Sequence, residues 1–148
     1  MDREAGIDSI YDSLERIRRA QRRRRNALEQ AERSGVFLSP LSLSILAELH
    51  RHGPTRIQVL TERADAELPR VSREVHLLEE SGHVSIEPDP RDKRVRIVRP
   101  TEEGTTQWRA FQAAGHEMLH ERLGAWNEGD ITELATLLGR FLERDRSS

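Results

Sequence analysis

Basic and hydrogen-bonding side chains gather at two places in this 148-residue sequence, and both places could bind a nucleic acid. The first holds Arg70, Ser72, Arg73 and His76, and the second holds Arg91, Lys93 and Arg94. Guanidinium groups can form paired hydrogen bonds with phosphate oxygens or with a guanine edge, and a serine hydroxyl can serve either target. Two acids, Asp89 before the second group and Asp92 within it, could hold its arginines in one orientation.

The first group lies on a helix that Pro69 is predicted to open and Gly82 to close. Val71, Val75 and Leu78 recur at helical spacing, which predicts one buried face. The opposite face then carries Pro69, Ser72, Arg73 and His76, with Arg70 beside them. Glu74 and Glu79 fall toward the inner side or the flank, so the outward face is basic.

The second group lies in a loop between two predicted strands. Val84 and Ile86 alternate with polar residues before the loop, and Val95 and Ile97 do so after it. Residues 88–94 between them are rich in proline and aspartate, which predicts a hairpin loop with the basic group at its tip. A thin loop that presents arginine is suited to the minor groove of DNA.

Two shorter helices are predicted before the basic helix. Ser39 caps the first and Pro40 starts it, and Thr55 to Gln58 read as a capping box that starts the second. Three short helices followed by a hairpin form a winged helix-turn-helix, in which the last helix lies in the major groove.

Longer helices are predicted on both sides of residues 38–100. The first covers residues 8–32, another is capped by Thr101, and a last one is capped by Asp130 and Glu133. The outer helices carry apolar stripes formed by Ile7, Ile10, Leu14 and Ile17, and by Ile131, Leu134, Leu137, Leu138, Phe141 and Leu142. Residues 38–100 cannot cover both stripes, which predicts a homodimer.

The expected fold class is therefore mainly α with a small β hairpin (α+β). Residues 38–100 are predicted to form the winged helix-turn-helix DNA-binding region, flanked by N- and C-terminal dimerisation helices in residues 1–37 and 101–148.

Composition narrows the function classes. The chain holds 24 basic and 26 acidic residues, so DNA binding must rest on where the charges lie. Cysteine is absent, which excludes disulfides, thiolate zinc sites and a cysteine nucleophile. No apolar run approaches the roughly 18 residues that cross a bilayer, and the N-terminus resembles no signal peptide. No catalytic set is recognisable, so we expect a cytoplasmic protein without membrane contact, enzymatic activity, metal or cofactor.

Three features leave alternatives open. His116 and His120 have a spacing that can chelate zinc, but Ser34 to Leu41 offer no further histidine or cysteine. The seven arginines between Arg16 and Arg25 could contact the DNA backbone, although such runs are more often solvated or paired between subunits. Trp108, Phe111 and Trp126 could line a ligand pocket or belong to a core or interface.

The residues from Asp89 to Val95, followed by Arg99 to Gly104, closely resemble the wing signature of the MarR family. Leu78 to Gly82 and Leu38 to Leu43 resemble that family's recognition-helix ending and its entry to the second helix. The resemblance implies a homodimer on a pseudo-palindromic operator, with repression usually relieved by a small ligand. It also implies that Arg94 enters the minor groove, with Asp92 or Asp89 orienting it. Two departures are Pro69 at the helix start and Arg99-Pro100-Thr101 in place of the family's usual leucine before the threonine.

Together these features predict a sequence-specific double-stranded DNA-binding regulator, a repressor released by a small-molecule effector. Such an effector is expected between the dimerisation helices and the winged helix. The rival hypothesis is a winged-helix module that binds proteins and has lost DNA binding.

Overall fold

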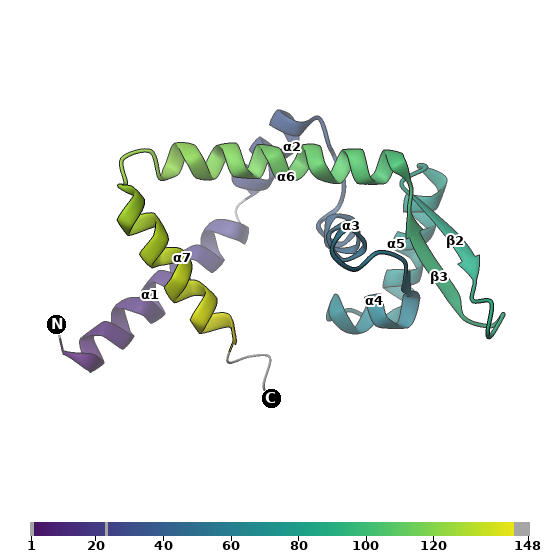
Figure 1. The fold of residues 1–148 in the computed structure, drawn as a ribbon, viewed down its shortest axis with the longest axis horizontal. Coiled ribbons are helices and arrows are strands. Elements are labelled where there is room, and N and C mark those ends of the chain that lie inside the picture. Colours follow the sequence, from purple (N-terminus) through teal and green to yellow (C-terminus); the bar gives the residue numbers. More distant parts are fainter. Residues whose placement is uncertain (1, 23, 144–148) are drawn as a thin grey trace. The chain divides into compact units, whose positions relative to one another are not determined.

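The computed structural model describes residues 2–22 and 24–143, with side chains for all of these except residues 21, 22, 24 and 25. The chain divides between Ala114 and Gly115 into two compact units. Its elements, drawn in Figure 1, are α1 (Arg3–Arg22), α2 (Arg24–Ser34), α3 (Pro40–His52), β1 (Thr55–Arg56), α4 (Ile57–Arg63), α5 (Leu68–Glu80), β2 (Val84–Pro88), β3 (Arg96–Pro100), α6 (Glu102–Arg122) and α7 (Glu128–Glu143). The predicted fold class, mainly helical with a small sheet, is confirmed. None of the described helices is long and apolar enough to cross a membrane.

The core of the first unit lies between α3, α4, α5 and the sheet. Val71, Val75 and Leu78 of α5 are almost completely buried, as their spacing predicted. They pack in one cluster with Ile45, Leu46, Leu49, Leu60, Val84 and Val98. Each such side chain contributes on the order of 1.5–3 kcal/mol when removed from water, so this cluster fixes which face of α5 is turned outward.

The sheet contains a third strand that the sequence did not predict. The strand order is β1-β3-β2, and both pairings are antiparallel. Thr55 pairs with Val98 and its hydroxyl donates to the carbonyl of Gly53 (2.9 Å). The predicted capping box at Thr55 is therefore wrong: α4 begins at Ile57, and Arg56 occupies the N-cap position without a side-chain cap.

The second hairpin strand turns a different set of residues inward from the one predicted. Val98 is fully buried, whereas Ile97 is half-buried and Val95 precedes the strand. Val98 lies opposite Ile86 and Thr55, so these three share one face of the sheet. A shift of one residue exchanges the two faces of a strand, which is why a short alternating run left the phase open to error.

Several of the described helices begin at a side-chain cap. The Ser39 side chain accepts a hydrogen bond from the backbone N–H of Ser42 (3.0 Å), which confirms it as the cap of α3. The predicted first helix corresponds to α1 and α2. The last helix begins earlier than predicted, at Glu128. Its cap is Asn127, whose side chain accepts from the N–H of Asp130 (2.9 Å), rather than Asp130 and Glu133.

The base of the hairpin is joined to the start of α6 by a close backbone contact. The Thr101 hydroxyl donates to the carbonyl of Gly82 (2.6 Å), and its N–H donates to the carbonyl of His83 (3.1 Å). The same hydroxyl caps α6 by accepting from the N–H of Gly104 (3.0 Å). A Cβ on Gly104 would lie 1.9 Å from the His83 carbonyl oxygen and 2.8 Å from its carbonyl carbon. Only glycine fits at this position without moving the backbone.

We expect Gly104→Ala to lower the free energy of unfolding by roughly 1–3 kcal/mol or more, because α6 must move away from His83. Urea denaturation followed by circular dichroism measures this. Gly6→Ala is the matched control, since a Cβ on Gly6 of α1 has no neighbour within 4 Å and alanine favours a helix. Equal stability of the two variants would contradict the close contact.

Candidate nucleic-acid interface

The outward face of α5 carries the first predicted group of basic residues. Arg70, Arg73 and His76 are exposed, and Ser72 is half-buried. They lie away from the buried stripe of Val71, Val75 and Leu78, so the core packing itself turns them toward solvent. An exposed helix with two arginines and a serine in its first half, and a histidine one turn later, can donate hydrogen bonds to base edges and phosphates.

The acids of α5 are drawn toward neighbouring elements. Glu74 accepts hydrogen bonds from the hydroxyls of Ser39 and Ser42 at the start of α3, the latter at 2.7 Å. Glu79 accepts from the backbone N–H of Ile86 in β2 (3.1 Å). One oxygen of Glu79 also lies 3.9 Å from the Nδ1 atom of His76. The carboxylates of Glu74 and Glu79 thus help to hold α5 against α3 and the hairpin, and the arginines dominate the outward face.

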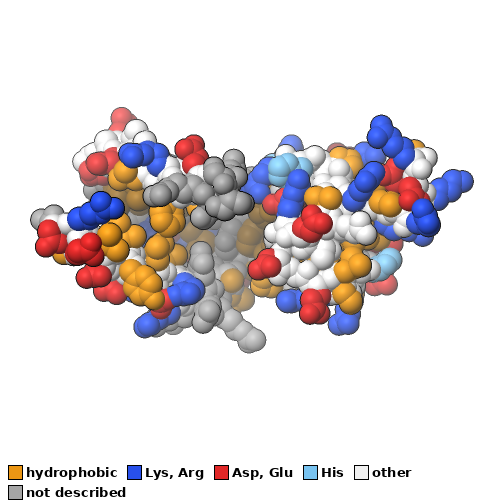
Figure 2. Space-filling view, turned by 90° about the horizontal axis from the view of Figure 1, so that it is seen from below, with side chains coloured by type: hydrophobic (Ala, Val, Ile, Leu, Met, Phe, Trp, Pro, Cys, Tyr) orange, Lys and Arg blue, Asp and Glu red, His pale blue; other side chains and the backbone are white. Residues whose placement is uncertain are grey.

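The loop between β2 and β3, residues 89–95, is called the wing loop here. Its two ends are joined because the N–H of Asp89 donates to the carbonyl of Val95 (2.8 Å). The N–H of Val95 donates to the carbonyl of Asp92 (2.9 Å), which closes a tighter turn inside the loop. Arg91, Lys93 and Arg94 are all exposed. Figure 2 shows Lys and Arg side chains gathered at the end of the molecule that carries β2 and β3.

Within the wing loop, Asp92 holds Arg94. The carboxylate of Asp92 accepts from Nε (3.1 Å) and Nη2 (3.3 Å) of Arg94, and from its backbone N–H (3.1 Å). The Arg94 side chain is still 91% exposed. The hydrogen bonds from Arg94 lower the pKa of Asp92 below its ordinary value. A guanidinium held in this way is oriented before any ligand arrives, yet it remains open to solvent.

The other acid, Asp89, has a different partner. Its side chain is almost buried, and Oδ2 accepts a hydrogen bond from Nη2 of Arg56 (2.7 Å), while Oδ1 accepts from the N–H of Arg91 (2.9 Å). The N–H of Arg91 and the guanidinium of Arg56 lower the pKa of Asp89 against the opposing effect of burial. Of the two predicted orienting acids, only Asp92 contacts Arg94. Sequence reasoning missed Arg56, because no motif connects residues 33 positions apart.

Residues 38–95, which run from the approach to α3 to the end of the wing loop, match the sequence model described as the MarR family. This part of the chain is similar to the MarR family. The HTH-type transcriptional repressor NicR of Pseudomonas putida is 24% identical over 141 residues, which cover 93% of this chain and 89% of the relative.

Solved structures share the fold at low sequence identity. A MarR family protein from Bacillus stearothermophilus aligns with a TM-score of 0.82 at 18% identity, over 100% of both chains. The PcaV transcriptional regulator from Streptomyces coelicolor, solved in complex with its natural ligand, aligns with a TM-score of 0.53 at 19% identity. That alignment covers 71% of this chain and 74% of PcaV.

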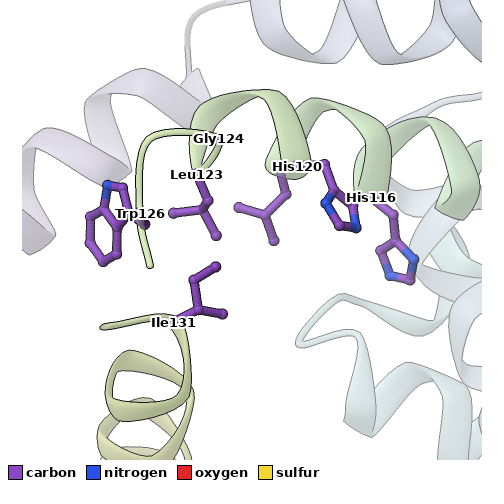
Figure 3. Close-up of a pocket in the computed structure, with 7 residues that line it drawn as sticks. His116, His120, Leu123, Gly124, Trp126 and Ile131 are labelled. Atoms are coloured by element: carbon purple, nitrogen blue, oxygen red, sulfur yellow. The ribbon is translucent and has the colours of Figure 1, made fainter. Parts of the chain in front are cut away.

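The second unit holds a pocket of about 420 Å³ near the turn between α6 and α7 (Figure 3). It is lined by His116, Leu119, His120, Leu123, Gly124, Trp126 and Ile131. Among the described residues, no group of three or more His, Cys, Asp or Glu side chains is placed to hold a metal ion. The histidine pair therefore has no third protein ligand of these types in the described part of the chain.

The three aromatic residues that sequence reasoning left open lie in different surroundings. Trp108 packs against the buried cluster of the first unit, and its ring lies 6.0 Å from that of Phe111 and 6.5 Å from that of His50. Trp126 instead lines the pocket of the second unit. The arginine run from Arg16 to Arg25 lies partly outside the described side chains. Within the described part, Arg18 and Arg19 pair with Glu15 on the same helix.

We expect Arg94→Ala to raise the pKa of Asp92 toward its ordinary value and to leave that of Asp89 unchanged, because the Arg94 side chain bonds to the carboxylate of Asp92 and not to that of Asp89. Carboxyl carbon chemical shifts, followed by NMR through an acid titration, measure both values. In the wild type, the lowered pKa of Asp92 means that its ionised carboxylate stabilises the folded loop at pH values above the ordinary aspartate pKa. This contribution to stability is lost as the pH falls through the lowered pKa. An unchanged Asp92 midpoint in Arg94→Ala would contradict the contact.

Proposed function

We propose that this chain is a sequence-specific transcription regulator that binds double-stranded DNA as a homodimer, and that it is a repressor released by a small-molecule effector. One observation carries the proposal: the outward face of α5 and the wing loop present exposed arginines, while Glu74, Asp89 and Asp92 are engaged by neighbouring groups. A near-neutral chain can bind a polyanion through such a local surface.

In this proposal α5 enters the major groove. Arg73 donates a bidentate pair of hydrogen bonds to a guanine edge, and Arg70, Ser72 and His76 contact neighbouring bases or phosphates. The wing loop reaches the adjacent minor groove with Arg94, whose guanidinium is already held by Asp92. Arg91 and Lys93 contact phosphates beside it. Asp89 acts inside the loop rather than at its tip.

The homodimer is proposed from the apolar side chains of the outer helices. Ile7, Ile10, Leu14 and Ile17 of α1 are exposed, as are Ile131, Leu137, Leu138, Phe141 and Leu142 of α7. Exposed apolar stripes on two helices are typical of an interface between subunits, and a two-fold axis would match a pseudo-palindromic operator. We therefore propose residues 38–100 as the DNA-binding region, with residues 1–37 and 101–148 as the dimerisation region.

Repression and release by an effector are proposed from the relatives. NicR is named a transcriptional repressor, and PcaV was solved with its natural ligand. Both properties can be tested on this chain once its operator is known. A duplex selected by the wild-type protein from a randomised pool serves as that operator in the experiments below.

Arg73→Ala should weaken binding to the selected duplex by about 1–3 kcal/mol and relax the preference at one base position per half-site, because one bidentate contact is lost. Fluorescence anisotropy with single-base variants of the duplex measures both effects. Arg109→Ala removes the same charge from an exposed position of α6 and should change neither. The rival hypothesis, a winged-helix module that binds proteins, would be favoured if the selection recovers no sequence preference and the wild-type protein does not bind duplex DNA.

Phe141→Glu should abolish the dimer, because it places a charge in the proposed apolar interface, where burying one such side chain contributes on the order of 1.5–3 kcal/mol. Sedimentation equilibrium measures the oligomeric state, and anisotropy measures the accompanying loss of DNA binding. Glu143→Gln, on the same helix, is the control and should remain dimeric. A wild-type protein that sediments as a monomer at micromolar concentration would refute this part of the proposal.

A further inference from the structure

The wing loop is tied to the entry of α4 by the ion pair of Arg56 and Asp89. Nη2 of Arg56 lies 2.7 Å from Oδ2 of Asp89, whose side chain is only 5% exposed. Arg56 is half in solvent at 51% exposure. A carboxylate this well buried needs a charged or hydrogen-bonded partner, and Arg56 provides the charged one.

The remaining polar groups of Asp89 organise the wing loop itself. Oδ1 accepts from the N–H of Arg91 (2.9 Å), and the backbone N–H donates to the carbonyl of Val95 (2.8 Å). Asp89 therefore fixes both ends of the loop, and Arg56 fixes Asp89. If Arg56 were removed, the carboxylate would lose its charged partner and would turn toward water, taking the Arg91 end of the loop with it.

The backbone of Arg56 is placed by both the sheet and α4. It pairs with Ile97 in the sheet and occupies the N-cap position of α4, directly before the first turn of that helix. It is thus joined both to the sheet that carries the wing loop and to the first helix of the helix-turn-helix. This makes the side chain a physical link between two parts of the proposed DNA-binding surface.

We propose that Arg56 is a positioning residue for DNA recognition, which acts through Asp89 to hold the wing loop in the conformation that enters the minor groove. The proposal rests on the proposed DNA-binding function. Its alternative is that Arg56, half exposed, contacts a DNA phosphate directly. The two can be separated because the positioning role needs Asp89 and the phosphate role does not.

The first test is footprinting on the selected duplex. Hydroxyl-radical cleavage reports the minor groove that the wing loop covers, and methylation of guanine N7 reports the major groove that α5 covers. Arg56→Ala should lose the minor-groove protection, keep the major-groove protection at saturating protein, and bind about tenfold or more weakly. Arg99→Ala is the matched control: Arg99 is 52% exposed on β3, pairs with Glu87 at 3.7 Å, and does not hold the loop. It should keep both protections.

The second test is a double-mutant cycle between Arg56→Ala and Asp89→Asn. Removal of a negative charge from a DNA-binding surface would by itself strengthen binding to a polyanion. The positioning role predicts the reverse: Asp89→Asn weakens binding, loses the minor-groove protection, and adds little to Arg56→Ala in the double variant. Arg56→Lys should bind more tightly than Arg56→Ala but more weakly than the wild type. The lysine ammonium keeps the positive charge but lacks the planar set of donors of a guanidinium.

The outcomes decide between the roles. Direct phosphate contact by Arg56 predicts that Asp89→Asn binds DNA as well as the wild type. It also predicts that Arg56→Ala lowers the slope of log affinity against log salt concentration by roughly 0.9, the value for one lost phosphate contact. These results would overturn the positioning role. Minor-groove protection that persists in Arg56→Ala would also overturn it. Thermal unfolding within a few degrees of the wild type shows that a weak variant is folded. Wild-type protein without any protection would refute the proposed function itself.

Discussion

The close contact between the start of α6 and the backbone of His83 is the constraint on which the arrangement of the first unit depends. Gly104 lacks a Cβ, so the first turn of α6 can lie against the carbonyl of His83, and Thr101 bonds to both Gly82 and His83. The end of α5, the start of β2 and the end of β3 therefore meet at one point. The basic helix and the wing loop share this anchor, so these backbone contacts help to set their relative orientation.

The proposed DNA-binding surface is basic although the chain as a whole holds slightly more acids than bases. The local basic surface arises from the partners of its acids. Glu74 is bound by the hydroxyls at the start of α3, and Asp89 by Arg56 and the loop backbone. Asp92 stays beside Arg94 and orients it. Each of these three acids thus has a structural partner, while the guanidinium groups of Arg70, Arg73, Arg91 and Arg94 stay exposed and contribute to a positive potential at this surface.

Much of this architecture could be predicted from the sequence because its causes are local. The buried stripe of α5 follows from residues three and four positions apart, and it determines that Arg73 and His76 point outward. The caps of α3 and α6 could be predicted because each is a hydroxyl that accepts a hydrogen bond from the backbone N–H three residues later. The motif of the wing loop indicated the resemblance to the MarR family and left Asp92 or Asp89 as the partner of Arg94; the structure selects Asp92, which is two positions away.

Only the tertiary structure decided the features that depend on distant partners. Two residues, Thr55 and Arg56, form a strand because β3 lies beside them, and nothing in so short a segment predicts it. The inward face of β3 depends on a one-residue register that is set by Ile86 and Thr55 across the sheet. Asp89 binds Arg56, not Arg94, because the sheet brings together residues 33 positions apart. Periodicity and capping act within one or two turns of chain, whereas strand pairing and a buried ion pair require the fold to be complete.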